Sequence, residues 1–173
     1  MNQLAALSVS IAVLGGVWAF LALGPLAGAV LVWAGFIAWG AYFHTGGDNA
    51  ALQKTIAGTV YGAIIGGIAL LLVVHNPVGL PAAAAAPVYV AVTVFFLVIV
   101  AGCNLLSVVP NNVYGYAGVV AYALQTPTAN GVGPLASLTA VSLANPILLL
   151  SISYVIGAVF GMLSGKLAGM LGK

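Results

Sequence analysis

Long apolar runs alternate with short polar breaks along the whole chain. Most of the breaks contain Gly, Pro, Asn or Asp, which end helices or start turns. Each run approaches the roughly 20 residues that a helix needs to cross a bilayer. The pattern predicts an all-α polytopic membrane bundle of about six transmembrane helices, at residues 4–23, 26–43, 53–74, 87–104, 110–125 and 146–171.

The connections between these runs differ in length. Gly24-Pro25 is a helix stop followed by a permitted helix start, so the first two helices are expected to form a tight hairpin. Residues 78–86, with an alanine run between Pro81 and Pro87, are expected to form a loop. Residues 126–145 form a longer connection, in which 135–143 is either loop or a half-helix that dips into the membrane.

The composition supports the membrane assignment. Hydrophobic residues make up 64% of the 173 residues and charged residues 2%, against roughly 25% charged residues in soluble domains. Six spans would use up the chain, so we expect a single integral membrane domain over residues 1–173. The lipid bilayer is its expected partner, and nucleic acid is not, because phosphate binding needs clustered cations.

The few charged residues predict the orientation. Lys54, Lys166 and Lys173 stand against a single acid, Asp48. With six spans, all three lysines fall on one side of the membrane together with both termini. The positive-inside rule therefore predicts a multi-pass protein whose two termini are cytoplasmic.

The fifth run carries most of the polar side chains that lie inside an apolar stretch. At 100° per residue they occupy one helical face about 100° wide, which must be buried in protein or line a wet cavity. One interpretation is a solute path, and the other is an interhelical hydrogen-bond cluster. The path would use Asn111, Tyr114, Tyr122 and Gln125, with Asn104 and Asn112 near its mouth and Trp39 and Tyr42 as counterparts from the first half of the chain.

Two rows of glycines recur every fourth residue in the third and sixth runs. Small residues at this spacing let membrane helices approach closely. The rows predict helix packing within or between subunits, hence a homo-oligomer, with a backbone-lined pore as the alternative. Their members are Gly58, Gly62 and Gly66, and then Gly157, Gly161, Gly165 and Gly169.

A weak internal similarity relates the two halves. Residues 35–42, GFIAWGAY, resemble residues 115–122, GYAGVVAY, at an offset of 80 residues (35 to 115). The glycine rows correspond at an offset of 99 residues (58 to 157). The similarity indicates two inverted three-helix repeats, a design of transporters and channels, or else chance similarity among small residues.

The residues that are missing narrow the function. The sequence has one acid, one cysteine, no nucleotide-binding loop and no set of nucleophile, base and orienting acid. We therefore expect no enzyme, no metal and no cofactor. The sequence predicts a passive channel or facilitator for a small, largely neutral polar solute that it does not identify. The alternative is a nonconducting structural or accessory subunit whose polar seam only holds helices together.

Two segments carry a family resemblance. Residues 16–43, followed by a Gly-Gly turn, and residues 107–123 resemble the YcdZ-like family of small bacterial inner-membrane proteins, a domain of unknown function; the shared motifs are Trp33-Ala-Gly35-Phe36, Tyr42-Phe43 and Val109-Pro110. More distantly, the chain is similar to half of a fusaric-acid-resistance or aromatic-acid-exporter membrane domain. The resemblance implies a bacterial inner (plasma) membrane location and movement of small organic solutes. The chain lacks the soluble domain and the cationic residues typical of those exporters.

Overall fold

The computed structural model describes residues 1–126 and 133–172, and these residues form no β-strand. The α-helices are α1 (Gln3–Leu23), α2 (Val32–His44), α3 (Asn49–His75), α4 (Ala82–Ile99), α5 (Val109–Gln125) and α6 (Pro146–Leu171). Short 3₁₀ helices follow at η1 (Val100–Gly102), η2 (Asn104–Leu106) and η3 (Pro134–Ser137). The predicted all-α bundle of six helices is confirmed.

The helices differ in their capacity to cross a membrane. Four of them, α1, α3, α4 with η1, and α6, are long and apolar enough to span a bilayer. Helices α2 and α5 have 13 and 17 residues. At ~1.5 Å per residue they are about 20 and 26 Å long, shorter than the ~30 Å hydrocarbon core. The two short helices are thus too short to span the hydrocarbon core alone, and each packs on a long helix, α2 on α6 and α5 on α3.

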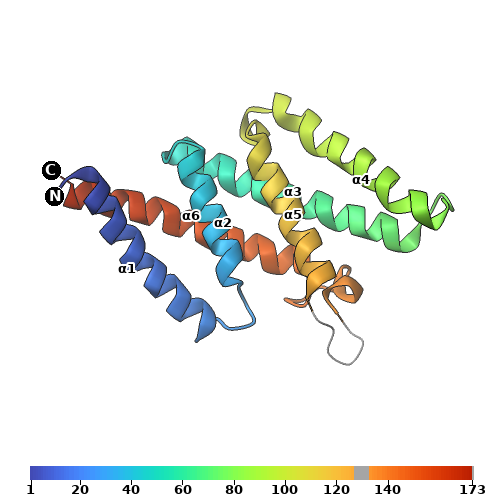
Figure 1. Ribbon diagram of the computed structural model, residues 1–173, viewed down its shortest axis with the longest axis horizontal. Coiled ribbons are helices and arrows are strands. Elements are labelled where there is room, and N and C mark those ends of the chain that lie inside the picture. Colours follow the sequence, from blue (N-terminus) through green and yellow to red (C-terminus); the bar gives the residue numbers. More distant parts are fainter. Residues whose placement is uncertain (127–132, 173) are drawn as a thin grey trace.

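The six helices form two similar units of three. Figure 1 shows α3 and α6 running in opposite directions through the middle, with α2 across α6 and α5 across α3. Helix α1 flanks α6 at one end, and α4 flanks α3 at the other. A half-turn about the viewing direction of Figure 1 brings α1, α2 and α3 onto α4, α5 and α6. This is the arrangement expected of two inverted three-helix repeats.

The glycine rows of both long helices pack against a short helix. A Cβ at Gly62 would meet the backbone of Asn112 and Tyr116, one at Gly66 the backbone of Tyr116, and one at Gly157 the backbone of Gly35. Under the offset of 80 residues, Gly35 corresponds to Gly115, which lies between Asn112 and Tyr116. Both long helices therefore use glycines of their rows to approach a short helix closely.

The first connection is longer than predicted. Helix α2 begins at Val32 and not at residue 26, and residues 24–31 form turns, with Leu26 N donating to Leu21 O and Ala27 N to Gly24 O. Gly28 has a φ of 80°, a left-handed conformation that glycine adopts without steric cost and that ends helical pairing. The predicted tight hairpin is therefore wrong, and a turn region separates α1 from α2.

Other predicted boundaries also shift. Helix α4 begins at Ala82, so the predicted loop at 78–86 is wrong in its second half; alanine has the highest helix propensity, and Pro87 is tolerated inside the helix. The predicted fourth run ended at residue 104, but α4 ends at Ile99 and continues as 3₁₀ turns. In the 135–143 segment the structure has a four-residue 3₁₀ helix, η3, and no half-helix.

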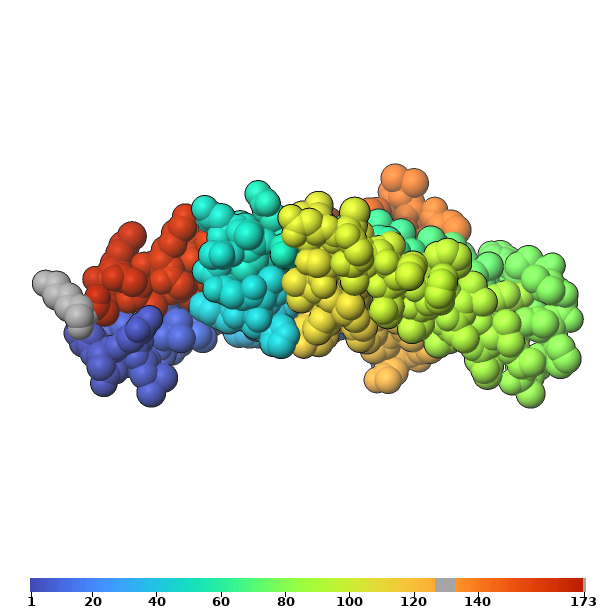
Figure 2. All heavy atoms as spheres, turned by 90° about the horizontal axis from the view of Figure 1, so that it is seen from above, coloured from blue at the N-terminus to red at the C-terminus, as the bar shows by residue number. Residues whose placement is uncertain are grey.

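The molecule is an elongated slab. Figure 2 shows it from above, with α1 and α6 at one end and α4 at the other. The N- and C-terminal ends lie next to each other in Figure 1. Because α2 returns toward the end from which α1 starts, the turn at residues 45–48 lies on the same side of the bundle as the termini. At the centre of the slab α3 packs against α6, and α2 lies beside α5.

Candidate functional site

The polar face of α5 divides into a buried part and an accessible part. Asn111, Gly115 and Gly118 are buried against neighbouring helices. Tyr114 and Gln125 are exposed and Tyr122 is half-buried. The division follows from the crossing of α5 over α3, which covers one edge of the face and leaves the other beside α2.

The buried part centres on Asn111. Its side chain is fully buried, and its Nδ2 donates to Thr45 Oγ1 at 3.0 Å and to Thr55 Oγ1 at 3.4 Å. The Thr45 hydroxyl donates its own hydrogen bond to Ala41 O. It can therefore only accept from Asn111, so the N–H groups of the Asn111 amide must face this threonine. Its Oδ1 then points away and has no hydrogen-bond partner among the described residues.

Asn112 is fixed in the same way, with a second unpartnered oxygen. Its Nδ2 donates to Leu97 O and to Leu106 O, both at 3.2 Å. Carbonyl oxygens only accept, so the amide cannot be turned around. Asn112 Oδ1 is buried without a partner and faces Gly58, where a Cβ would lie 2.8 Å from it. We call Asn111, Asn112, Thr45, Thr55 and Gly58 the amide seam.

Three of the seven glycines in the two rows make close backbone contacts. A Cβ at Gly62 would lie 1.9 Å from Asn112 O, one at Gly66 2.8 Å from Tyr116 O, and one at Gly157 2.1 Å from Gly35 O. At Gly161 a Cβ would lie 3.0 Å from the Tyr42 ring. Helix packing of this kind requires glycine, because a Cβ cannot overlap a neighbouring backbone.

The accessible part of the α5 face lines a groove between α2 and α5. One hollow of about 510 Å³ is followed by a second of about 380 Å³. The lining of the first comprises Trp33, Phe36, Ile37, Gly40, Ala41 and His44 from α2 with Tyr114, Ala117, Gly118 and Ala121 from α5. The second is lined by Trp33, Ala121, Tyr122, Gln125 and Thr126. We call the two hollows together the α2–α5 groove.

The groove follows most of the length of the two short helices. His44, the last residue of α2, marks one end, and Gln125, the last residue of α5, marks the other. Trp33 and Ala121 line both hollows. The lining carries no Asp, Glu, Lys or Arg side chain. The groove is therefore an uncharged depression with polar groups at its ends and an apolar middle.

The structure separates the other predicted path residues from the groove. Trp39 is buried and its Nε1 donates to Ser164 Oγ at 2.9 Å. Tyr42 is buried and its hydroxyl donates to Gly47 O. Asn104 is exposed in η2, away from the lining of either hollow. Of the eight predicted residues, Tyr114, Tyr122 and Gln125 line the groove, and Asn111 and Asn112 belong to the amide seam.

Sequence reasoning predicted a contribution from α2, through Trp39 and Tyr42, but missed the face of α2 that lines the groove. Trp33, Phe36, Ile37, Gly40 and His44 stand at offsets 0, 3, 4, 7 and 11, which is one helical face. The periodicity therefore placed these residues on one face of α2. It could not identify the groove, because an apolar face of a membrane helix has the same sequence pattern whether it meets lipid or lines a groove.

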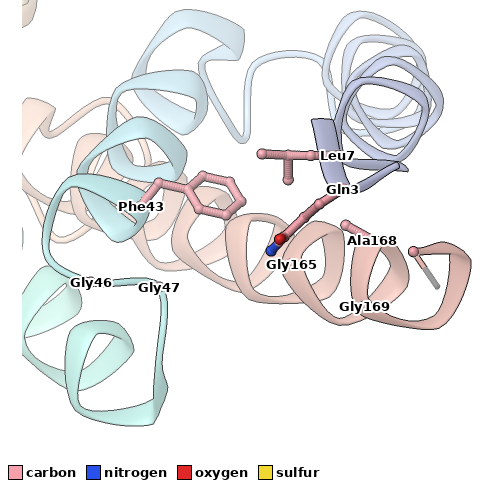
Figure 3. A pocket seen from close by; sticks show the side chains of 9 residues that line it. Gln3, Leu7, Phe43, Gly46, Gly47, Gly165, Ala168 and Gly169 are labelled. Carbon is pink, nitrogen blue, oxygen red and sulfur yellow. The ribbon is translucent and has the colours of Figure 1, made fainter. Parts of the chain in front are cut away.

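A third hollow, of about 580 Å³, lies near the termini (Figure 3). The side chain of Gln3 points into it from α1, with Phe43 opposite. Gly165 and Gly169 of α6 line it, and a Cβ at Gly169 would meet nothing within 4 Å. At Gly165 a Cβ would still contact the rings of Phe43 and Tyr42 of α2, at 3.7 Å or more, so only Gly169 faces the hollow without a neighbouring helix.

Comparisons with known proteins give one match. A family model described as a protein of unknown function, DUF1097, matches residues 8–169. No curated protein and no solved structure matches the chain.

Proposed function

We propose that this chain, which belongs to the DUF1097 family of proteins of unknown function, is a passive facilitator for a small, largely neutral polar solute. Its path would be the α2–α5 groove. The observation that carries this proposal is that two hollows, which share Trp33 and Ala121, follow each other along the two short helices from His44 to Gln125. Polar side chains at its ends would replace the water molecules that hydrogen-bond to the solute. Its uncharged middle would let the solute pass without binding it tightly.

The chemistry of the lining supports an uncharged solute. A charge moved into an apolar passage needs a partner of opposite charge or a strong hydrogen-bonding shell. The groove lining has no ionised acid, lysine or arginine. Passage of an organic anion, as in the exporters that the sequence distantly resembles, would lack such a partner.

The repeat arrangement gives independent support. Helices α2 and α5 are equivalent under the half-turn that relates the two units, so the groove lies between matching elements of the two repeats. Transporters built from inverted repeats commonly have their substrate path at that interface.

A residue without a side chain allows a clean test. Gly40 lines the groove, and a Cβ added there would meet nothing within 4 Å. Gly40→Leu should therefore fill the groove without straining the fold, and solute flux should fall about tenfold or more, as expected when a path is sterically closed. Flux of glycerol and urea into proteoliposomes would be followed by stopped-flow light scattering.

Gly16→Leu is the matched control. Gly16 lies on α1, away from the groove, and a Cβ there also meets nothing within 4 Å. This variant should retain the wild-type flux. Equal flux in the Gly40 and Gly16 variants would reject the groove as the path, and wild-type flux no faster than that of empty liposomes would reject the facilitator.

A nonconducting structural or accessory subunit is the second candidate, and the amide seam favours it. The two hydrogen bonds from Asn112 join α5 to Leu97 of α4 and to Leu106 of η2. A seam with only this role predicts that Asn112→Leu lowers the unfolding temperature or dissociates a complex, while the wild-type protein transports none of the tested solutes.

Location and assembly complete the proposal. We propose a bacterial inner membrane location of the YcdZ-like kind, with both termini cytoplasmic beside Lys54 and Lys166; Lys173 lies outside the described residues. We also propose a homo-oligomer, in which a neighbouring subunit would separate the exposed side of the groove from lipid. Protease access to terminal tags in sealed inverted vesicles tests the orientation, and the mass after gentle detergent extraction tests the assembly.

A further inference from the structure

Trp33 stands at the boundary between the two hollows of the α2–α5 groove. It is one of two residues that line both hollows, and the other, Ala121, contributes only a methyl group. The indole is therefore the bulkier of the two side chains at this boundary. We infer that Trp33 is the specificity-determining residue of the groove and sorts uncharged solutes by their cross-section; this inference rests on the proposed function.

The backbone beside Trp33 is anchored on both sides. Leu31 N donates to Ser153 Oγ of α6 at 2.9 Å, and Val32 O accepts from Trp18 Nε1 of α1 at 3.0 Å. The N–H groups at the start of a helix lack intrahelical partners, so the serine hydroxyl satisfies a group that would otherwise be unpaired. These two bonds tie the start of α2 to α6 and α1. The ring is thus carried by a segment with little freedom to move aside.

The opposite wall is fixed by a different helix. Ala121 lies on α5, which packs closely on α3 through Gly115, where a Cβ would lie 2.0 Å from Thr59 O. The start of α2 and the part of α5 that carries Ala121 are thus both held in place by other helices. The side chain of Trp33 is 40% exposed and lines both hollows. In the proposed path, shortening or removing the indole would admit a larger solute.

The lining also defines the solute class. The boundary has an aromatic ring on one side and a methyl group on the other, while Tyr122 and Gln125 of the second hollow offer hydrogen-bonding groups. No charged side chain distinguishes one ion from another. The structure thus favours uncharged hydrogen-bonding molecules of a few heavy atoms, separated by size.

A ladder of polyols tests this inference, because glycerol, erythritol and xylitol share one chemistry and differ in size. In wild-type proteoliposomes the flux should fall about tenfold from glycerol to xylitol, comparable to the discrimination that one or two carbon groups provide in a tight apolar site. Trp33→Ala should raise xylitol flux about tenfold and so bring the ratio of glycerol flux to xylitol flux close to one. Trp33→Phe should give a ratio between that of Trp33→Ala and that of the wild type. Ala121→Leu should act in the opposite direction and increase the ratio.

Phe20→Ala is the matched control. Phe20 lies on α1, its side chain is 72% exposed, and it lines neither hollow. Its removal leaves the groove unchanged, so the wild-type order of polyol fluxes should persist. A Trp33→Ala protein with the wild-type ladder would overturn the inference while leaving the facilitator intact. Wild-type protein that transports no polyol and no urea would overturn the proposed function and, with it, the role of Trp33.

Discussion

The α2–α6 and α3–α5 contacts are equivalent under the half-turn of the fold, yet they are built from different chemistry. In both, glycine brings two backbones into contact, at Gly157 with Gly35 and at Gly62 with Asn112. In the α2–α6 contact the Trp39 indole is satisfied by Ser164. In the α3–α5 contact two buried amide oxygens, those of Asn111 and Asn112, have no partner among the described residues.

The difference shows that the close approach of the helices does not depend on buried polar side chains. Since both contacts achieve the same close approach, the amides are not needed for it. Under the offset of 80 residues, Asn111 and Asn112 correspond to Leu31 and Val32, so the first half has apolar residues at the matching positions. The amides therefore mark where the two repeats have diverged, at the end of the groove that carries Tyr114 and His44.

The largest effect should come from breaking the backbone contact itself. In Gly62→Ala the Cβ would lie 1.9 Å from Asn112 O, and in Gly157→Ala it would lie 2.1 Å from Gly35 O. Backbone cannot rotate away as a side chain can, so each variant should lose about 3 kcal/mol of stability or more. Thermal unfolding in detergent measures the loss.

Gly16→Ala is the control for both variants, because a Cβ there meets nothing within 4 Å. Equal losses at Gly62 and Gly157 would support equivalent packing of the two halves. A stable Gly157 variant beside an unstable Gly62 variant would show that the halves are not mechanically equivalent.

An intermediate effect is expected from Asn112→Leu. The change removes the donor to Leu97 O and Leu106 O, and unpairing buried carbonyls costs about 1–3 kcal/mol. Removal of the unpartnered Oδ1 offsets part of this, so a loss of about 1–2 kcal/mol is expected. Denaturant unfolding would measure it, with Val113→Leu, an exposed position on the same helix, as the control. No loss relative to Val113→Leu would mean that the amide is not what holds α4 to α5.

The smallest effect concerns the satisfied contact. Trp39→Phe and Ser164→Ala each remove one partner of the hydrogen bond between Trp39 Nε1 and Ser164 Oγ. A double-mutant cycle should give a coupling of about 0.6 kcal/mol, the average for such bonds within membrane proteins. A coupling indistinguishable from zero would mean that the bond adds nothing to the α2–α6 contact beyond its packing.

Much of the fold was predictable because local signals agreed with it. Helix α6 has the predicted bounds of 146–171, since Asn145 supplies a capping side chain and Pro146 a favourable first residue. The start of α2 was missed because residues 26–31 are as apolar as a helix, and only the left-handed Gly28 breaks the pattern. Apolar composition predicts burial or lipid contact, but it does not predict the backbone conformation.

The candidate site was predictable only on one side. Periodicity placed Tyr114, Tyr122 and Gln125 on a common face of α5, and these residues line the groove. It also placed Asn111 on that face, and Asn111 is buried because α5 crosses α3 at that edge. Which edge of a face is covered depends on how helices from distant segments cross, and the sequence of one helix does not predict that crossing.

The pairing of α2 with α6 has a consequence for biosynthesis. During translation α1 and α2 leave the ribosome well before α6, against which both of them pack. Long-range partners of this kind slow assembly, because the chain must close a large loop before the contact forms. Helices α3, α4 and α5 have their contacts with one another available earlier. In nascent chains arrested before residue 146, α3, α4 and α5 should therefore be ordered, while α1 and α2 still lack α6.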